Sequence, residues 1–208
     1  DPEQIKREAW PAWKPALMAA HKPQGLEDLS SEAPARTRLA YDELFAHQLT
    51  LALARQAERK SRGIVSQATG HLQGAVLASL PYRPTAAQAR AIDEISADMA
   101  SDRRMNRLLQ GDVGSGKTLV AFMALLVAVE AGGQGVMMAP TGILAQQHFE
   151  GLRPIAEQAG VVLELLTGRD KGAERRAKLA ALEAGDIQIL VGTHAVFQQD
   201  VVFRRLHL

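Results

Sequence analysis

The sequence of 208 residues contains no cysteine, which excludes disulfide bonds, thiolate metal sites and thiol-based catalysis. It has no apolar run of the roughly 18–20 residues that a bilayer-spanning helix needs. Its first residues lack the pattern of a signal peptide, and the first of them is not Met. These absences together favour a cytoplasmic protein that does not enter a membrane.

An excess of charge of one sign is lacking as well. The 24 lysines and arginines against 23 acidic residues leave a net charge of +1. The overall balance gives no sign of nucleic-acid binding, so any basic track for DNA must be local. The six histidines show no paired spacing for a metal site, and only His194 is a candidate for a functional role.

One motif identifies a class of ligand. Gly111–Thr118 reads Gly-Asp-Val-Gly-Ser-Gly-Lys-Thr, a complete phosphate-binding loop. Arg107–Leu109 before it predicts a short buried strand, and Leu119–Glu130 after it predicts a helix rich in Ala and Leu. Strand, loop and helix in this order are the context in which the motif binds a nucleoside triphosphate.

Each residue type in this loop has a physical role. Glycines permit backbone angles that turn successive N–H groups toward a phosphate, and the helix N-terminus adds roughly half a positive charge. Lys117 is expected to neutralise the terminal phosphates and the Thr118 hydroxyl to ligate Mg²⁺, which gives both a catalytic role. The predicted binding residues are Gly111, Gly114, Ser115, Gly116, Lys117 and Thr118.

A candidate for adenine recognition precedes the loop. The amide of Gln88 offers a donor and an acceptor together, which matches the N6/N7 edge of adenine. Tyr82 offers a stacking face and Arg83 a cation. In the alternative interpretation, Thr85 caps a helix whatever Gln88 does.

Most of the chain alternates between strands and helices. Short apolar runs predict strands at Gly135–Ala139, Val161–Leu166 and Ile187–Val191. Helices are predicted at Leu72–Leu80, Thr85–Met99, Gly142–Gln158 and Lys171–Glu183. This order predicts an α/β fold with a doubly wound parallel sheet and the nucleotide at its carboxyl edge.

The first 80 residues are expected to precede this domain. Residues 1–33 predict an irregular connector packed by Trp10 and Trp13, and residues 34–80 a helical linker. The main part of the linker is one long amphipathic helix with Pro34 in its first turn. Its closing cations either offset the helix dipole or face DNA; they are Arg55, Arg59, Lys60 and Arg62.

Three predicted strand ends carry hydroxyl groups. Thr141 follows the first strand, Thr167 and Gly168 follow the second, and Thr193 with His194 follows the third. Because the carboxyl ends of parallel strands share one edge of a sheet, together they predict a track of contacts to nucleic-acid phosphates. Taken singly, each is also explained as a helix cap.

Phosphate-loop enzymes use an acidic residue at the end of a neighbouring strand to hold Mg²⁺ and activate water. Asp93 and Glu94 lie inside a predicted helix, and Asp170, Asp186 and Asp200 lie in polar turns. None of these positions suits the role. The acid is therefore expected beyond the end of this sequence.

Four segments resemble the RecG family, bacterial ATP-dependent DNA helicases that migrate branched DNA. The segments are Leu80–Gln88, Met105–Thr118, Ala139–His148 and Val191–Ala195. The resemblance implies a RecA-like motor lobe that uses ATP and Mg²⁺, with adenine contacts from Gln88, Tyr82 and Arg83. It assigns contacts with the DNA backbone to Pro140, Thr141, Thr167, Gly168, Thr193 and His194.

Members of this family remodel stalled replication forks, and they need a wedge domain and a second motor lobe. The sequence shows neither, so it resembles the linker and most of the first motor lobe, residues 81–208, of such a protein in the bacterial cytoplasm. Forked DNA and ATP are the expected partners, and the fragment alone is expected to be inactive. The alternatives are a transcription-repair coupling translocase, a small phosphate-loop kinase and a non-catalytic nucleotide-binding module.

Overall fold

The computed structural model describes residues 2–59 and 62–208. Packing divides the chain into a first unit of residues 1–60 and a second unit of residues 61–208. The division at residues 33 and 80 inferred from the sequence follows the expected roles of the segments and stays a prediction. In the described part of the chain, no helix has the length and apolar character needed to cross a membrane.

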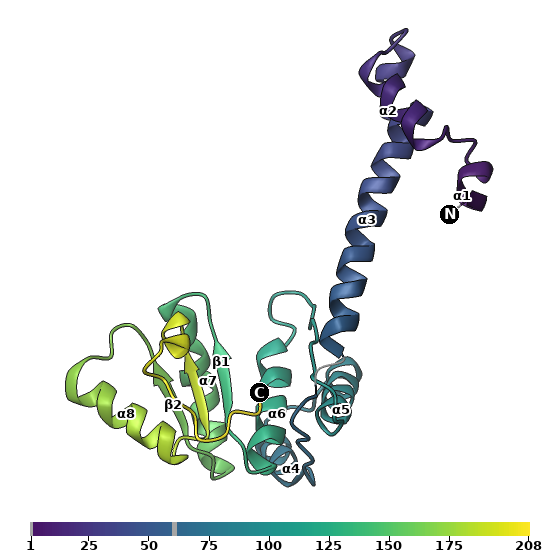
Figure 1. Ribbon diagram of the computed structural model, residues 1–208. Coiled ribbons are helices and arrows are strands. Elements are labelled where there is room, and N and C mark those ends of the chain that lie inside the picture. The colour runs from purple at the N-terminus through teal and green to yellow at the C-terminus, as the bar shows by residue number, and fades with distance from the viewer. Residues whose placement is uncertain (1, 60–61) are drawn as a thin grey trace. The chain divides into compact units, whose positions relative to one another are not determined.

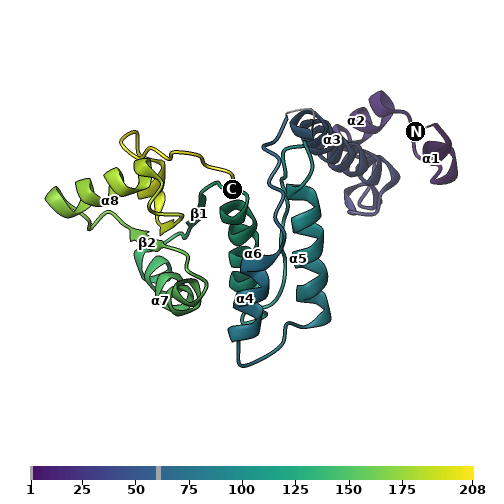
Figure 2. The ribbon, with the colours of Figure 1, turned by 90° about the horizontal axis from the view of Figure 1, so that it is seen from below.

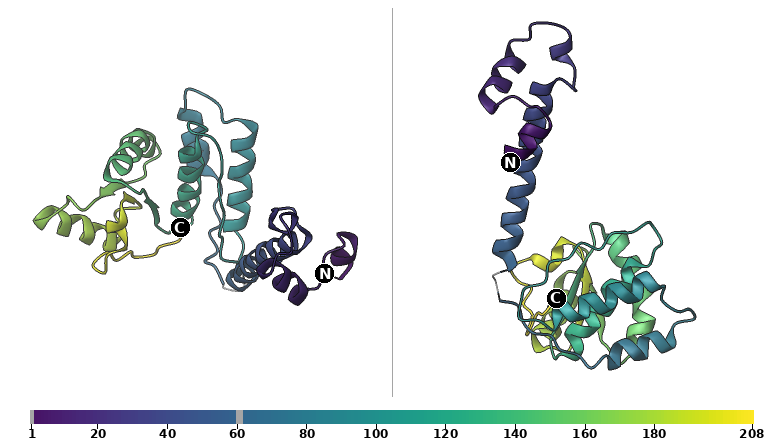
Figure 3. Two further views of the ribbon diagram at one scale, coloured as in Figure 1. Left: turned by 90° about the horizontal axis from the view of Figure 1, so that it is seen from above. Right: turned by 90° about the vertical axis from the view of Figure 1, so that its right-hand side faces the viewer.

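The first unit consists of short helices and one long helix (Figures 1 and 3). Its elements are α1 (Pro2–Arg7), α2 (Trp13–His21), η1 (Glu27–Leu29) and α3 (Pro34–Arg59). α3 begins at Pro34, as predicted, because the fixed φ of proline suits a first turn whose N–H groups have no acceptor within the helix. Trp10 packs on Tyr41 with ring centroids 5.0 Å apart, whereas Trp13 is 54% exposed. The prediction that both tryptophans pack the connector was therefore wrong for Trp13.

The apolar residues predicted along one side of α3 are only partly covered. Leu39 and Tyr41 are half-buried, whereas Leu44, Leu49 and Leu53 are exposed, although α2 packs on α3. Among the closing cations, Lys60 and the side chain of Arg59 lie outside the described residues. The role of that cluster stays a prediction.

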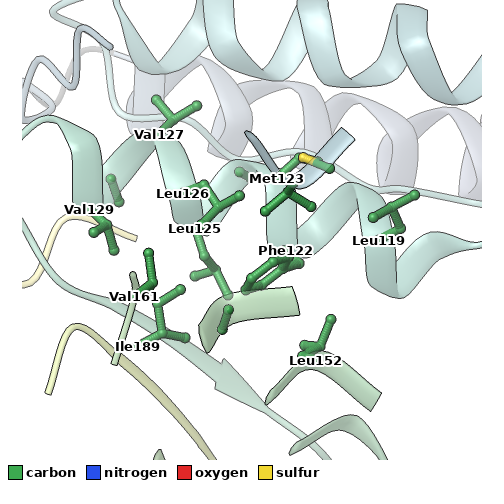
Figure 4. Packing of buried hydrophobic residues seen from close by; sticks show 14 of the residues in the cluster. Leu119, Phe122, Met123, Leu125, Leu126, Val127, Val129, Leu152, Val161 and Ile189 are labelled. Atoms are coloured by element: carbon green, nitrogen blue, oxygen red, sulfur yellow. The ribbon is translucent and has the colours of Figure 1, made fainter. Parts of the chain in front are cut away.

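The second unit is built around α6 (Lys117–Glu130), a helix that is apolar on all sides. Ten of its residues are buried, as expected for a helix with no polar face. α4 (His71–Ser79) and α5 (Ala86–Met99) pack on it (Figure 2). Figure 4 shows Phe122 and Leu125 of α6 near Leu152 of α7 (Gly142–Gln158) and Ile189. This packing forms the main core.

A three-stranded parallel sheet completes the unit. Its order is β1 (Gly135–Met138), β3 (Ile189–Gly192) and β2 (Leu163–Leu166), with Ile189 opposite both Gly135 and Leu163. In β3, Ile189 and Val191 belong to the main core, while Leu190 packs in a second cluster with Leu182 of α8 (Gly172–Ala184). Helices therefore cover both faces of the sheet, which confirms the predicted doubly wound, RecA-like fold.

The strand predicted at Arg107–Leu109 was wrong. This segment has no strand conformation, and Leu108 is 89% exposed. A strand needs a neighbouring strand whose backbone accepts and donates hydrogen bonds along its edge, and no described strand pairs with these residues. The edge of β1 opposite β3 is taken by residues near the C-terminus, where Leu206 forms a parallel bridge with Gln134 and the Val136 N–H donates to the Leu208 carbonyl.

Candidate functional site

The phosphate loop has the backbone that its sequence predicts. Gly114 and Gly116 adopt φ angles of +80° and +79°, in the left-handed region that side chains disfavour. Gly116 is the N-cap of α6, and a Cβ atom there would lie 2.3 Å from Nε2 of Gln88. A side chain at this position would strain the backbone and displace the Gln88 amide. The loop is therefore set at the N-terminus of α6, where backbone N–H groups can face an anion.

Lys117 lies over the loop that precedes it. Its Nζ donates to the carbonyl oxygens of Gly111 and Asp112 at 2.8 and 2.7 Å. An ammonium group has three N–H donors, so one remains for a phosphate oxygen. Thr118 follows as the second residue of α6 and is half-buried. The loop thus presents a cation and a hydroxyl side by side at the start of the helix.

Gln88 connects α5 to the phosphate loop. The side-chain Oε1 of Gln88 accepts from the Thr85 backbone N–H at 2.8 Å, and the backbone N–H of Gln88 donates to the Thr85 hydroxyl. These two bonds form a capping box at the start of α5. The Nε2 of Gln88 donates to the carbonyl of Ser115 at 2.8 Å. The interpretation of Thr85 as a helix cap is confirmed. Tyr82 and Arg83 lie in the exposed turn before α5, and the contact of all three with adenine stays a prediction.

The predicted strand-end residues do come together. They line a groove of about 490 Å³ whose walls are Pro140, Gly142, Ile143, Gln146, Gln147, Thr167, Gly168, Arg169, Thr193 and His194. Thr141 lies beside it and caps α7, because its hydroxyl accepts from the Leu144 N–H. Pro140, Thr167, Gly168, Thr193 and His194 are thus placed as the sequence predicts, at the shared carboxyl edge of the three strands.

Gly192 explains how two of these strand ends approach each other. A Cβ atom at this last residue of β3 would lie 2.2 Å from the carbonyl oxygen of Leu166, the last residue of β2. Any side chain there would push the ends of the two strands apart. The glycine before Thr193 therefore keeps the second and third strand ends close enough to form one groove.

Several groove residues were missed by the sequence interpretation. Ile143, Gln146 and Gln147 line it from the first turns of α7, and Arg169 adds the one cation among its walls. The sequence could have predicted them, since residues at positions i, i+3 and i+4 of a helix capped by Thr141 lie on one face of that helix. Among the lysines and arginines, only Arg169 therefore lines the groove.

Three of the five acidic residues considered in the sequence are paired with cations. Glu94 lies on α5 and pairs with Arg107 at 2.8 Å, as expected for a residue of that helix. Asp170 pairs with Lys178, and Asp200 pairs with Arg175. Among the described residues, no group of three or more His, Asp or Glu side chains could hold a metal ion.

Comparison with known proteins confirms the predicted resemblance to RecG. The ATP-dependent DNA helicase RecG of Bacillus subtilis is 44% identical to this chain over 100% of the chain and 30% of its own length. The protein of the same name from Escherichia coli is 43% identical over 93% of the chain and 28% of its own length. The chain thus spans less than a third of the length of the curated relatives that it matches.

A solved structure described as RecG bound to a three-way DNA junction has the same fold. It aligns with a TM-score of 0.75 and 42% identity over 92% of this chain and 26% of that chain. The sequence profile of the DEAD/DEAH box helicases matches residues 85–207, a range that holds the phosphate loop, the sheet and the groove. On this match, the chain belongs to the DEAD/DEAH box helicase family.

Proposed function

We propose that this chain is the first motor lobe, with its linker helix, of an ATP-dependent DNA helicase that acts on branched DNA. One observation carries the proposal: a complete phosphate loop on α6 and a groove at the carboxyl edge of the sheet lie in the same unit. The names of the relatives support it, since RecG is an ATP-dependent DNA helicase and one RecG is described as bound to a three-way junction.

The residues of the loop fit ATP with Mg²⁺. Hydrolysis of bound ATP supplies the free energy for movement along DNA. The chain's own part is to hold the β- and γ-phosphates with the N–H groups around Gly114 and Gly116 and with the remaining N–H of Lys117. The Thr118 hydroxyl is the proposed Mg²⁺ ligand. Tyr82, Arg83 and Gln88 are the proposed adenine contacts.

The groove fits a nucleic-acid backbone rather than bases. Its walls carry hydroxyl groups, backbone amides at the start of α7 and one arginine, all of which bind phosphate oxygens. We propose that Pro140, Thr141, Gly168, Thr193 and His194 follow one strand of DNA without regard to its sequence, and that Thr167 holds the loop that carries Gly168.

The proposal extends to the biological setting. We infer a role in the remodelling of stalled forks during repair and recombination, in the bacterial cytoplasm and at the nucleoid. The wedge domain and second motor lobe would belong to the same parent chain, and the 208 residues alone would bind nucleotide without turnover. The translocase and kinase alternatives are less favoured because the matched relatives, 41–44% identical, are RecG helicases.

The experiment compares the intact parent protein with the 208-residue chain. ATP hydrolysis is measured with no DNA, with a linear duplex and with a three-way junction of equal length. We expect the intact protein to hydrolyse ATP fastest with the junction, and the short chain to bind ATP without hydrolysing it. Equal stimulation by the linear duplex and the junction would exclude a preference for branched DNA.

A further inference from the structure

The loop between β2 and α8 carries a cluster of charges beside the groove. Lys178 of α8 places its Nζ 2.7 Å from Oδ1 of Asp170 and 3.0 Å from the carbonyl oxygen of Leu165, in β2. The side chains of Asp170 and Lys178 are only 10% and 20% exposed, so water screens their attraction little. Lys178 therefore joins the helix to the strand and to the loop that follows it.

Asp170 in turn holds Thr167. Its Oδ2 accepts from the backbone N–H of Thr167 at 2.7 Å and from the Thr167 hydroxyl at 3.1 Å. The same hydroxyl accepts from the Arg169 N–H at 3.3 Å. Both donors of Thr167 are thus engaged by Asp170, so the hydroxyl does not donate to a phosphate in this arrangement.

The Asp170–Lys178 pair is ionised at neutral pH. Burial opposes the charge of Asp170, but hydrogen bonds from Lys178 and Thr167 outweigh it and lower the pKa of the carboxyl. Burial likewise opposes the charge of Lys178, and the neighbouring carboxylates raise its pKa overall. Lys178 offsets the charge of the Asp170 carboxylate beside the groove, and its Nζ also lies 3.6 Å from Oε1 of Glu164 and 3.4 Å from Oε1 of Glu174.

A second cation on α8 reaches the segment that follows β3. Arg175, three residues before Lys178, donates to both carboxylate oxygens of Asp200 at 3.0 Å and to Oε1 of Gln198 at 2.8 Å. Gln198 directly follows η2 (His194–Phe197), the short helix that begins in the groove wall. α8 is therefore bonded to the chain beyond two of the three strand ends.

We propose that α8 is a brace that fixes the shape of the groove, and that Lys178, acting through Asp170, is a positioning residue for DNA binding. The loop after β2 then contacts the backbone through the Gly168 N–H and the Arg169 guanidinium, while Thr167 shapes the loop. This inference rests on the proposed function of the groove.

The test uses Lys178→Met in the intact parent protein with forked DNA. We measure the DNA concentration that gives half-maximal ATP hydrolysis, the maximal rate and the KM for ATP. We expect about a 3- to 10-fold rise in the half-saturating DNA concentration, because a carboxylate is left unpaired beside the groove and the loop gains freedom. The KM for ATP is expected to stay unchanged.

Two further variants separate positioning from loss of charge or of folding. Arg176→Met removes one cation from an exposed position of the same helix and is expected to have the wild-type half-saturating concentration. Lys178→Arg keeps the positive charge and is expected to retain most of the wild-type affinity for DNA. If Arg176→Met weakened DNA binding as much as Lys178→Met, general charge would explain the result and the brace would be overturned.

A double-mutant cycle and amide exchange complete the test. If Thr167→Val and Lys178→Met act on one loop, their effects on DNA affinity are less than additive; full additivity would overturn the inference. Without DNA, Lys178→Met is expected to speed exchange of the Thr167 and Arg169 amides. Should wild-type protein not bind forks, the proposed function fails, and unchanged amide exchange in Lys178→Met would separately overturn the brace.

Discussion

The side-chain Nε2 of Gln88 donates to the backbone carbonyl of Ser115 at 2.8 Å, across 27 residues of sequence. This bond ties the first turn of α5 to the phosphate loop. Because the Gln88 Oε1 is bonded to the Thr85 N–H at the same time, one side chain contributes both to the start of a helix and to the position of the loop. The two contributions can be separated by substitution.

Gln88→Glu is expected to keep the helix cap and lose the tie to the loop. Glutamate still accepts from the Thr85 N–H but has no donor for the Ser115 carbonyl. The free energy of unfolding is expected to change by less than about 0.5 kcal/mol, while ATP affinity falls because the loop is freer and a negative charge lies near the phosphates. Titration calorimetry with ATP and Mg²⁺, together with urea unfolding, measures both quantities.

The matched control is Thr85→Ala, which removes the cap and leaves the Ser115 bond. It is expected to cost about 1 kcal/mol of stability, as loss of a threonine cap does elsewhere, with ATP affinity retained. Equal ATP affinity in Gln88→Glu and wild type would show that the Ser115 bond does not position the loop.

Lys117→Ala is expected to weaken nucleotide binding about 10- to 100-fold, since a hydrogen bond to a charged group contributes about 1.5–3 kcal/mol. Stability should change little, because the present acceptors of Lys117 are exposed loop carbonyls. Binding of a fluorescent ATP analogue measures the loss. Lys171→Ala, at an exposed lysine before α8, serves as control; an equal effect in both variants would contradict the assignment of the loop.

The 208-residue chain is expected not to hydrolyse ATP above background, with or without DNA. None of the strands β1, β2 and β3 ends in an acidic residue that could hold Mg²⁺, and an arginine finger alone contributes roughly 10³–10⁵ in rate in related enzymes. Release of phosphate from purified chain is the measurement. Turnover that disappears in Glu94→Gln or Asp93→Asn would show that one of these residues has been misinterpreted.

Glu130, the last residue of α6, is expected to make folding stability depend on pH. Its carboxylate accepts from Thr69, His71 and Leu72 at the start of α4. Burial opposes its charge, but these bonds outweigh it and lower its pKa from 4.5 to about 2. A lowered pKa stabilises the fold above pH 4.5, and the contribution is lost as the pH falls from 4.5 toward 2.

Glu130→Gln is therefore expected to cost about 1–3 kcal/mol at pH 7, where charged acceptors are lost, and progressively less below pH 4.5. Urea unfolding at several pH values measures this difference. Glu183→Gln, the same change at an exposed carboxylate of α8, is the control. A Glu130→Gln deficit that stays constant between pH 7 and pH 2.5 would contradict the lowered pKa.

The contrast between Thr85 and Leu108 shows what the sequence could predict. The helix beginning at Ala86 is specified by residues three positions apart, so its cap and its start were predicted correctly. Leu108 lies in an apolar run, but a strand also needs a partner that is distant in sequence, and no described strand pairs with it. Likewise, the hydrogen bond from the Thr69 hydroxyl to the Glu130 carboxylate spans 61 residues, and no local sequence pattern predicts it.

The groove illustrates the same limit. Its threonines were expected at one edge because parallel strands place their carboxyl ends together. The sequence did not reveal that Asp170 engages both donors of Thr167, because this depends on how the loop after β2 turns back toward Lys178. Sequence motifs therefore predicted which residues share this edge of the sheet, whereas the structure was needed to tell which of their atoms remain for a ligand.

The last prediction concerns DNA binding itself. If the strand-end residues contact phosphates and not bases, affinity is indifferent to sequence and falls with salt by about 0.7–0.9 log units per tenfold increase for each phosphate neutralised. Arg169 is the one arginine or lysine among the groove walls, so we expect a shallow slope and a weak complex for the 208-residue chain. Fluorescence anisotropy with two unrelated sequences at several salt concentrations measures both.

In the intact parent protein, the double variant Thr193→Ala with His194→Ala is expected to hydrolyse ATP but to unwind forks poorly. Both residues line the groove at the end of β3, where a backbone contact transmits movement of the motor to the DNA. Nucleotide affinity should be unchanged, since neither residue belongs to the phosphate loop. Normal fork unwinding by the double variant would mean that these residues only shape the turn into η2, and that the track along DNA lies elsewhere.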